Sequence, residues 1–499
     1  MGIVGAGPAG IYAADILTKD DTLAASGVPV SIDVLDRLPS PYGLVRYGVA
    51  PDHPRIKQIQ QALHKVLDKP QVRFIGNVEY GRDLKLEDLR RHYDAVVFAT
   101  GSDRDRPLDI PGADLPGCHG AADFVAWYDS HPDTPDDWRV EGASVAVIGA
   151  GNVAVDVARI LAKDADDLLE TDITDNVHRG LGAKRVTDVH VFARRGIAQA
   201  KFTPMELREL DKQPGVEVVV DPEDFELCEA SLAAIEESNQ VKTNVKILQN
   251  WAIRDLRGEP RRLHLHFLHR PVEILGTDRV TGLRTERMEL TGDGGVRGTG
   301  ELVDHEVQAV YRAIGYLGSP VADLPFDEER GVIPNDGGRV LDLDDQPIPG
   351  VYATGWIKRG PVGLIGHTKG DALETVTNLV SDRDSLTPAP EPEPESFLRL
   401  LGERGVPFTT WEGWQRLESH EEALGEPHGR KRIKVRSRED MTRIARAESR
   451  GRPRRGGRAP GGPPAPAAVP APAAAASRLL RAAFAAARPR RPEPPASAV

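Results

Sequence analysis

Two glycine-rich turns have the spacing that nucleotide-binding loops require. GAGPAG (5–10) has the pattern G-x-G-x-x-G, and GAGNVA (149–154) repeats it with alanine in the last place. In such a turn the first glycine permits a tight bend, the second lets a pyrophosphate approach the backbone, and the third brings the helix close to the strand. The free N–H groups at the start of that helix then face the phosphates. The sequence therefore predicts two dinucleotide sites in one chain.

The residues that end the next strand distinguish the two sites. Asp36 ends VSIDVLD (30–36), and a carboxylate there accepts hydrogen bonds from ribose hydroxyls and repels a 2′-phosphate, which suits FAD or NAD(H). Arg194 and Arg195 end the corresponding strand of the second unit, where two guanidiniums can bind the 2′-phosphate of NADP(H). The alternatives are an ordinary strand-end acid and a solvated arginine pair. Hydride transfer from NADPH to a flavin is the reaction that this pairing indicates, because NAD at the first site lacks an obvious reaction.

The predicted elements around these turns alternate between strand and helix, which is typical of a doubly wound parallel sheet. The first unit contains a helix over 11–17, strands over 30–36, 72–78 and 95–101, and a helix over 54–68. The second unit contains a strand, turn and helix over 144–161 and a strand over 186–196.

The remaining segments carry weaker signals. Residues 241–317 contain short alternating runs and are predicted to be rich in strands, and 351–380 repeats the strand–glycine–helix pattern. Residues 387–396 are a Pro/Glu linker, and 397–425 is predicted to be helical. Residues 450–499 hold eleven prolines and are predicted to be disordered.

Composition excludes several classes of function. The net charge is −12, and because residues 450–499 carry ten Arg and one Glu (+9), the other 449 residues sum to −21, which gives no reason to expect nucleic-acid binding. The two cysteines, Cys118 and Cys228, form no CxxC pair and cannot ligate an iron–sulfur cluster. No apolar run approaches the ~18 residues of a membrane span, and the first residues do not resemble a signal peptide. We predict a cytoplasmic protein with no metal site.

Four stretches identify a family resemblance: IVGAGPAG (3–10), LPSPYGLVRYGVAPDHPRIK (38–57), VIGAGNVAVDVARIL (147–161) with FARRG (192–196), and YATGWIKRGPVGLIG (352–366). The chain resembles the adrenodoxin reductase type of ferredoxin–NADP⁺ reductase over about residues 1–449. The resemblance implies an α/β fold with two Rossmann-like, three-layer dinucleotide-binding domains. The FAD domain would comprise 1–103 and 326–449, with the NADP domain (104–325) inserted into it, and 450–499 would be the tail.

The resemblance also implies which residues contact the cofactors. The expected FAD contacts are Gly5, Gly7, Pro8, Ala9, Gly10, Asp36, Leu44, Val78, Trp356, Gly363, Leu364 and Ile365. The expected NADP contacts are Arg106, Ala150, Gly151, Asn152, Val153, Arg194, Arg195, Glu206, Trp356 and Gly363. His53 and Glu209 match a His and a Glu near the nicotinamide–flavin contact of the family, where they would tune polarity or handle a proton. After GLIG the family usually continues Thr-Asn-Lys, whereas this chain has His367-Thr368-Lys369; backbone contacts through Ile365 are expected to survive.

The electron acceptor must lie outside the chain, since neither a redox cysteine pair nor cluster ligands are present. A small acidic ferredoxin fits best, docking on Arg194, Arg195, Lys201 and Arg208 or on GRKRIKVRSR (429–438), and we expect a monomer or a weak dimer. The alternatives are an NADPH-oxidising subunit similar to the glutamate synthase small chain and a redox sensor without turnover. One further expectation concerns the first loop. Only Gly2-Ile3-Val4 precedes it as strand, shorter than the usual ~5–6 residues. Either this short strand suffices or the natural start lies several codons upstream, and we expect the second.

Overall fold

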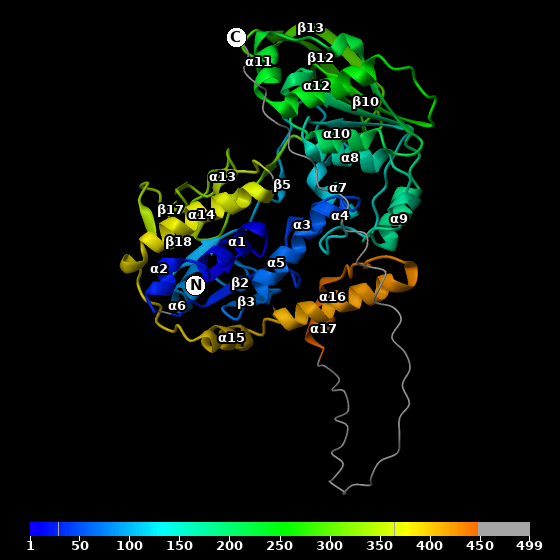
Figure 1. Ribbon diagram of the computed structural model, residues 1–499. Helices are drawn as coiled ribbons and strands as arrows, with labels where there is room; N and C mark the ends of the chain where they lie inside the picture. The colour runs from blue at the N-terminus through cyan, green and yellow to red at the C-terminus, as the bar shows by residue number, and fades with distance from the viewer. Residues whose placement is uncertain (28, 364, 448–499) are drawn as a thin grey trace, which may run out of the picture. The chain divides into compact units, whose positions relative to one another are not determined.

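The protein is described by a computed structural model that covers residues 1–27, 29–363 and 365–447 (Figure 1). Its first compact unit is Met1–Ala447. The side chain of Ile365 lies outside the description. The predicted tail, 450–499, lies outside the described residues as well. Within the described part of the chain, no helix is long and apolar enough to cross a bilayer.

An eight-stranded sheet organises the first part of the chain, in the order β16-β17-β18-β4-β1-β2-β3-β19. Strand β1 (Gly2–Val4) has only three residues but lies between β2 (Ile32–Leu35) and β4 (Val96–Phe98), parallel to both. Strand β3 (Val72–Gly76) follows β2, and β18 (Pro347–Ala353) returns from late in the sequence to pair parallel with β4. The first domain is therefore discontinuous, and the edge strands are β16 (Asn335–Asp336), β17 (Arg339–Leu341) and β19 (Thr409–Thr410).

Helices cover both faces of this sheet because successive side chains alternate between two cores. Ile3 packs with α1 (Pro8–Leu17), α5 (Ile59–Leu67) and α14 (Ile365–Ser381), while Val4 packs with α6 (Leu86–His92) and α15 (Pro394–Glu403). Two further helices, α16 and α17, join the first of these cores. The other helices of this part are α2 (Asp21–Ala25), α3 (Leu44–Tyr47), α4 (Pro54–Lys57), α13 (Trp356–Arg359), α16 (Trp411–Gly425) and α17 (Arg438–Arg446).

The middle of the chain forms three layers, visible in green and teal at the top of Figure 1. A six-stranded parallel sheet, in the order β6-β14-β7-β8-β10-β9, has a helical layer on one face and a three-stranded antiparallel sheet on the other. The parallel strands are β6 (Cys118–Gly120), β7 (Ser144–Ile148), β8 (Asp188–Ala193), β9 (Val216–Val220), β10 (Arg261–Phe267) and β14 (Ala309–Arg312). The antiparallel strands are β11 (His269–Leu275), β12 (Gly282–Thr291) and β13 (Gly295–His305). The helices are α7 (Ala121–Tyr128), α8 (Asn152–Ala162), α9 (Asp175–Gly182), α10 (Pro204–Leu210), α11 (Glu229–Glu237) and α12 (Asn239–Ala252).

One predicted strand region is a helix. Residues 241–252 belong to α12, not to a strand, although the segments from 261 onward are strands as predicted. The buried side chains Val245, Leu248 and Trp251 recur at intervals of three residues, which is a helical period, and the Ser238 side chain accepts a hydrogen bond from the backbone N–H of Val241 at the helix start. The short apolar run was compatible with either structure, and the cap decides between them.

Two antiparallel segments connect the sheets. Strand β5 (Arg104–Asp105), where the chain leaves the first sheet, pairs with β15 (Tyr316–Leu317), where it returns. Val321 and Leu324 already pack into the core that contains β4. The segment 318–325, which the predicted boundary assigns to the inserted domain, therefore packs against the first sheet.

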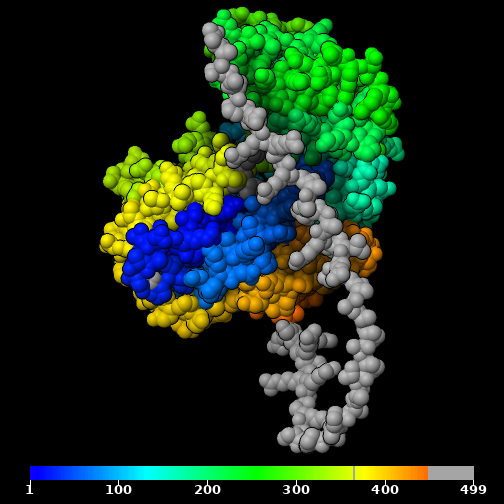
Figure 2. Space-filling model, in the orientation of Figure 1, coloured from blue at the N-terminus to red at the C-terminus, as the bar shows by residue number. Residues whose placement is uncertain are grey.

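The C-terminal basic run is largely buried, so it does not form the docking surface proposed for 429–438. Arg430, Arg432 and Lys434 are each at most 6% exposed. Arg430 donates to the backbone oxygen of Ile173 (2.7 Å), and Arg432 pairs with Glu418 (3.0 Å). The segment thus ties the C-terminal helices to the inserted domain, and Figure 2 shows the orange C-terminal residues against the blue N-terminal ones. Apart from the exposed Lys431, its cations make structural contacts.

Lys434 is the most deeply engaged cation of this segment. Its ammonium donates to the backbone oxygens of Asp129 (2.7 Å) and Arg46 (3.0 Å) and lies 3.3 Å from a carboxylate oxygen of Asp172. Burial lowers the pKa of Lys434 to about 8, against the attraction of Asp172, so the group is still charged at pH 7.

We expect Lys434→Met to lower the free energy of unfolding by about 3–5 kcal/mol at pH 7, because it leaves buried carboxylates with too little positive charge. Urea denaturation measures this change. Lys431, in the same run but exposed, is the control, and Lys431→Met should change the free energy by less than about 0.5 kcal/mol. Equal effects of the two substitutions would contradict the structural role of Lys434.

Candidate active site

The first glycine turn has the conformation that a phosphate cradle requires. Gly5 has φ +116°, and a Cβ on it would lie 2.3 Å from the backbone oxygen of Ala99. A Cβ on Gly10 would lie 2.1 Å from the oxygen of Gly5. A Cβ on Gly7, in contrast, would meet nothing within 4 Å. Gly5 and Gly10 are therefore needed by the fold, whereas Gly7 borders open space at the start of α1, where a pyrophosphate would lie.

Asp36 joins this turn to the end of β2. Its carboxylate oxygens accept hydrogen bonds from the backbone N–H groups of Ala6 and Leu38, each at 2.9 Å. Burial raises the pKa of Asp36 above its usual value, although both amide bonds favour the ionised form. A carboxylate has about four acceptor positions, so two remain for ribose hydroxyls.

Two later segments converge on the same turn. A Cβ on Gly43 would lie 3.1 Å from the Cα of Gly7, and a Cβ on Gly355 would lie 2.6 Å from the Cβ of Ala9, the residue after Pro8. Asp371 on α14 accepts a hydrogen bond from the backbone N–H of Gly355 and so holds this turn. Segments far apart in sequence thus surround one loop, as the resemblance implies.

The other predicted FAD contacts lie in different environments. Leu44 is 41% exposed at the start of α3, whereas Val78 is buried and its backbone N–H donates to the oxygen of Asp36 (2.9 Å). Trp356 is half-buried and stacks on Tyr316 of β15, with 6.3 Å between ring centroids. Gly363 is exposed with φ +88°. Leu364 lies outside the described residues, and Ile365 is described only as the first residue of α14.

The second glycine turn has the same geometry. Gly149 has φ +151°, and a Cβ on it would lie 2.3 Å from the backbone oxygen of Ala313, whereas a Cβ on Gly151 would meet nothing within 4 Å. The loop before α10 holds this turn: the Lys201 N–H donates to the oxygen of Ala150 (2.8 Å), and the Thr203 N–H donates to the side chain of Asn152 (2.9 Å). Val153 follows within the first turn of α8.

The predicted 2′-phosphate ligands lie where the motif requires them. Arg194 and Arg195 follow directly after β8 and are exposed. Across the part of the chain that the structure describes, neither guanidinium has a hydrogen bond or an ion pair. Arg106, just after β5, is also exposed, and its backbone N–H donates to the oxygen of Gly315 (3.0 Å). Both arginines of the pair are therefore available for an anion.

A buried charged cluster lies where the two domains meet. His53, 4% exposed, brings its Nε2 to 2.8 Å from Glu206 and 3.0 Å from Asp156, and its Nδ1 lies 3.4 Å from Glu209. Arg159, fully buried on α8, contacts His53 Nε2 at 2.6 Å and forms two hydrogen bonds of 2.9 Å with Asp52. His53, Glu206 and Glu209 thus come together as predicted sites, around an arginine.

Asp156 and Arg159 are cluster members that the sequence reasoning missed. They are three residues apart on α8, and their ion pair measures 2.8 Å. A signal was present, because Arg159 interrupts an apolar run, VARIL, on the helix that starts at the second glycine turn. A buried guanidinium on such a helix must have acidic partners nearby.

The cluster keeps His53 protonated. Burial opposes the charged form, but hydrogen bonds to Asp156 and Glu206 outweigh it and raise the pKa of His53 to about 9. The pKa of Asp52 falls well below its usual range because Arg159 lies beside it, against the effect of burial. His53 can therefore donate hydrogen bonds at neutral pH and serve as a proton reservoir at the domain contact.

This shift predicts a pH dependence of stability. The folded pKa of about 9 exceeds the unfolded value of 6.5, so the stabilisation is complete below pH 6.5 and is lost as the pH rises through 9. The difference corresponds to roughly 3 kcal/mol. We expect denaturation at pH 6 and pH 9.5 to show this loss in the wild type and not in His53→Gln. The same pH dependence in both proteins would contradict the assignment.

Comparison with known proteins identifies the family. Residues 1–361 match the family described as pyridine nucleotide-disulphide oxidoreductase. NADPH-ferredoxin reductase FprA of Mycobacterium tuberculosis is 41% identical over 460 residues, covering 89% of this chain and 98% of that protein. Mitochondrial NADPH:adrenodoxin oxidoreductase of Arabidopsis thaliana is 36% identical over 463 residues, covering 89% and 94%. The chain belongs to the ferredoxin–NADP⁺ reductase family of adrenodoxin reductase type.

A solved structure of a family member matches the whole described fold. FprA of Mycobacterium tuberculosis in complex with NADPH has a TM-score of 0.81 and 41% identity, covering 89% of this chain and 98% of that one. The predicted architecture of two dinucleotide-binding domains, one inserted into the other, is confirmed. The chain described by the present structure therefore has two glycine turns that fit two dinucleotides. Both turns have open space at their second glycine.

Proposed function

We propose that this chain is a ferredoxin–NADP⁺ reductase, which oxidises NADPH with a bound FAD and passes electrons singly to a ferredoxin. One observation carries the proposal. The two glycine turns have the same geometry, but the strand that follows each turn ends in residues of opposite charge. The first is joined to Asp36, and the second faces two exposed arginines, Arg194 and Arg195. The first charge suits the ribose of FAD and the second suits the 2′-phosphate of NADPH.

The protein residues bind and align the two cofactors. A bound flavin supplies the redox chemistry, since it accepts a hydride and releases its two electrons one at a time. The turns around Gly7 and Gly151 would hold the two pyrophosphates at the N-termini of α1 and α8. Trp356, whose turn packs on Ala9 and whose ring stacks on Tyr316, lies beside both the first loop and the linker between domains. It is placed to cover the contact between the two rings.

We assign His53 and Glu209 to the polarity of that contact. His53 directs its Nδ1 toward Glu209, 3.4 Å away, while the carboxylates of Glu206 and Asp156 face its Nε2. Glu209 is partly exposed, with 28% of its side chain accessible, so it can exchange a proton with solvent. The pair therefore tunes the charge near the reacting rings and makes no bond to the substrate.

Four exposed cations remain as the proposed docking surface for an acidic ferredoxin: Arg194, Arg195, Lys201 and Arg208. Reduction of cytochrome c through ferredoxin should slow as ionic strength rises, because exposed charges are screened. Rates that are insensitive to salt would contradict electrostatic docking. We further propose that the protein is cytoplasmic, in line with its two free cysteines. We also propose that it is a monomer or a weak dimer.

Absorption spectroscopy tests the proposal directly. The purified protein should be yellow, should be bleached by NADPH under anaerobic conditions, and should reduce cytochrome c only when ferredoxin is added. Bleaching without ferredoxin-dependent turnover would favour a subunit similar to the glutamate synthase small chain. A colourless protein that binds nucleotide would favour the redox sensor, and either outcome would overturn the proposal.

A further inference from the structure

Histidines gather in the inserted domain, away from both glycine turns. Of the fourteen histidines in the chain, a contiguous group occupies the layer between the six-stranded and the three-stranded sheet. Its members are His190 on β8, His264 and His266 on β10, His269 on β11 and His305 on β13. Such a concentration of imidazoles is unusual in a layer that otherwise packs apolar side chains, and nothing in the proposed reaction uses it.

The strand register places three of these imidazoles on one face. His190 pairs directly with His264 in the parallel ladder, and His266 is two residues beyond His264 on the same strand. Asp188 is two residues before His190, so it shares that face. Their neighbours Val189, Val191 and Leu265 point to the opposite, helical core. One carboxylate and three imidazoles are therefore held together by backbone geometry.

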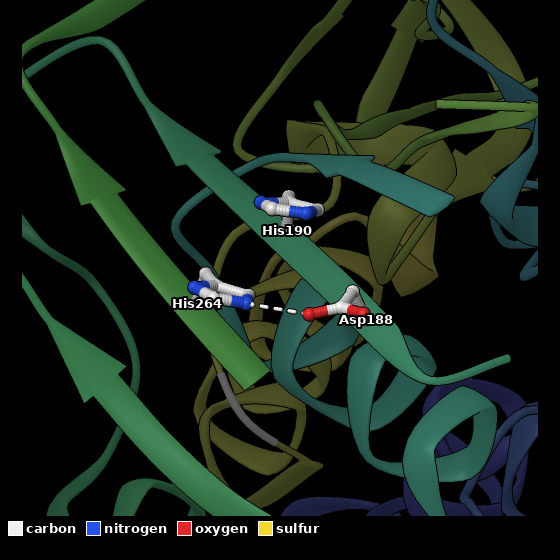
Figure 3. Close-up of side chains that lie close together, drawn as sticks. All are labelled: Asp188, His190 and His264. Atoms are coloured by element: carbon white, nitrogen blue, oxygen red, sulfur yellow. Dashed lines mark hydrogen bonds and ion pairs between the residues drawn. The ribbon is translucent and has the colours of Figure 1, made fainter. Parts of the chain in front are cut away.

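The distances within this group are short. His264 Nε2 lies 3.0 Å from a carboxylate oxygen of Asp188, and His190 Nδ1 lies 3.0 Å from His266 Nε2. One ligand atom from each of Asp188, His190 and His264 lies within 4.8 Å of the others. Figure 3 shows these three side chains on the two adjacent strands, with the Asp188–His264 contact dashed.

The imidazoles present neutral nitrogen lone pairs at physiological pH. Burial and the neighbouring His264 lower the pKa of His190 to about 4, and burial lowers that of His264 as well. The site nevertheless remains reachable, since 19% of the His264 side chain and 17% of Asp188 are exposed. Neutral imidazole with a carboxylate is the donor set that divalent ions of the zinc type prefer.

We propose that Asp188, His190 and His264 bind one divalent transition-metal ion of the zinc type, with His266 adjoining as a fourth donor. The rings of His190 and His264 now stack at 4.4 Å with their planes 7° apart, so their lone pairs do not yet converge. Rotation of a ring about its terminal torsion, which is a soft coordinate in histidine, turns a nitrogen toward the shared space. The bound ion would clip β8 to β10.

A neighbouring cation competes for the same carboxylate. The Arg262 Nε lies 2.9 Å from a carboxylate oxygen of Asp188, but the Arg262 side chain is 51% exposed and can move into solvent. The metal therefore displaces one solvated ion pair, which contributes little by itself. Arg262→Gln should tighten metal binding, because it removes both the competitor and a repulsive charge.

A second possible set in the same layer is less suitable. Asp224, His266 and His269 also lie within ligand distance of one another. Asp224 is buried, however, and already accepts hydrogen bonds from Arg287 and from the backbone N–H of Phe267. Arg287 also contacts His269 Nε2 at 2.8 Å. This permanent guanidinium occupies the place that an ion would need, so the proposal rests on the first set.

The proposed site is independent of the nucleotide site. Asp188 and His190 are at the start of β8, whereas Arg194 and Arg195 follow its end. Removal of the metal should therefore leave the KM for NADPH unchanged and lower the thermal midpoint, because an ion that binds only the folded state stabilises it.

Zinc titration of the full-length, tag-free holoenzyme tests the site, with a chromogenic chelator as competitor. We expect one Zn²⁺ per chain, and Co²⁺ should give the visible absorption of a nitrogen-ligated ion. Losing a partner outside the ligand shell already weakens metal sites by 10- to 100-fold, so His264→Gln should weaken binding by at least about 100-fold. His178→Gln is the matched control, since His178 pairs with Asp166 at 2.8 Å elsewhere on the surface, and it should change binding less than twofold.

Asp188→Asn and His190→Gln repeat the test in case His264→Gln misfolds, and the flavin spectrum and thermal midpoint report folding. The proposal is overturned if the wild type binds no Zn²⁺ beyond the level of weak surface sites. It is equally overturned if the folded ligand variants bind Zn²⁺ as tightly as His178→Gln does.

Discussion

Replacing both Arg194 and Arg195 by leucine raises the KM for NADPH by about 10²- to 10⁴-fold and leaves the KM for NADH nearly unchanged. Each guanidinium is expected to make a charge-assisted contact with the 2′-phosphate, worth ~1.5–3 kcal/mol, and 1.36 kcal/mol corresponds to a tenfold change. NADH lacks the phosphate and so loses nothing. Steady-state kinetics with both nucleotides measure the two constants.

The structure makes this prediction sharper than the motif alone does. Both arginines follow β8 directly, both are exposed, and among the described residues neither guanidinium has a partner to lose. Their removal should therefore leave the free energy of unfolding within about 0.5 kcal/mol of the wild type. A large loss of stability would mean that the side chains have a structural role.

Arg443→Ala provides the control, because Arg443 is 69% exposed on α17 and, within residues 1–447 as described, pairs only with nearby Asp440. It lowers the net charge without touching β8. If this control raises the KM for NADPH as strongly, the effect reflects the overall field of the protein. If the leucine pair raises the KM for both nucleotides equally, the 2′-phosphate assignment is wrong.

The glycine turns could be predicted because their conformations depend on local chemistry. Gly5 and Gly149 have positive φ values and closely approach a neighbouring strand, so only glycine fits there. The spacing of such residues is visible in the sequence. The same holds for Asp36 and the arginine pair, whose positions follow from the ends of predicted strands.

The buried charged cluster around His53 could be predicted only in part, because its members meet through tertiary packing. His53 and Arg159 are 106 positions apart, and nothing local relates them. The resemblance supplied His53, Glu206 and Glu209. It did not supply Asp156, which helps to hold the histidine in its protonated form, or the buried Asp52–Arg159 ion pair beside it. Sequence periodicity places each of them on an element and does not say which elements touch.

The basic run at 429–438 was predicted wrongly for the same reason, because its tertiary contacts are not visible in the sequence. Its charge density favoured an exposed docking surface, yet Arg430, Arg432 and Lys434 are buried against acidic residues and backbone oxygens. A run of cations is usually solvated because burial of a charge is costly. Here Asp129 and Asp172, far away in sequence, supply the compensating charge.

Single alanine substitutions at the second glycine of each turn should separate the two cofactors. Gly7 and Gly151 both precede a helix in an extended conformation, with φ −76° and −112°, that any residue can adopt. Neither added Cβ would meet an atom within 4 Å. Both variants should therefore fold, with free energies of unfolding in the absence of nucleotide within about 1 kcal/mol of the wild type.

Each of the two substitutions should strongly weaken the binding of one cofactor and leave the binding of the other unchanged. In Gly7→Ala the methyl group occupies the space assigned to the FAD pyrophosphate, and losing two N–H contacts to it costs ~3 kcal/mol or more, so flavin affinity falls at least about 100-fold. The purified variant should be colourless and inactive. In Gly151→Ala the flavin should remain bound at full occupancy, and the KM for NADPH should rise by a similar factor.

Gly10→Ala is the control that distinguishes loss of cofactor binding from loss of folding stability. Its Cβ would lie 2.1 Å from the Gly5 backbone oxygen, so this variant should be unstable even without nucleotide. Flavin content, thermal midpoints of the cofactor-free proteins and NADPH kinetics together distinguish the three cases. Flavin loss in Gly151→Ala with retention in Gly7→Ala would reverse the assignment of the loops. Loss of flavin from both variants would indicate that the domains do not bind their cofactors independently, and the two-site reading would then fail.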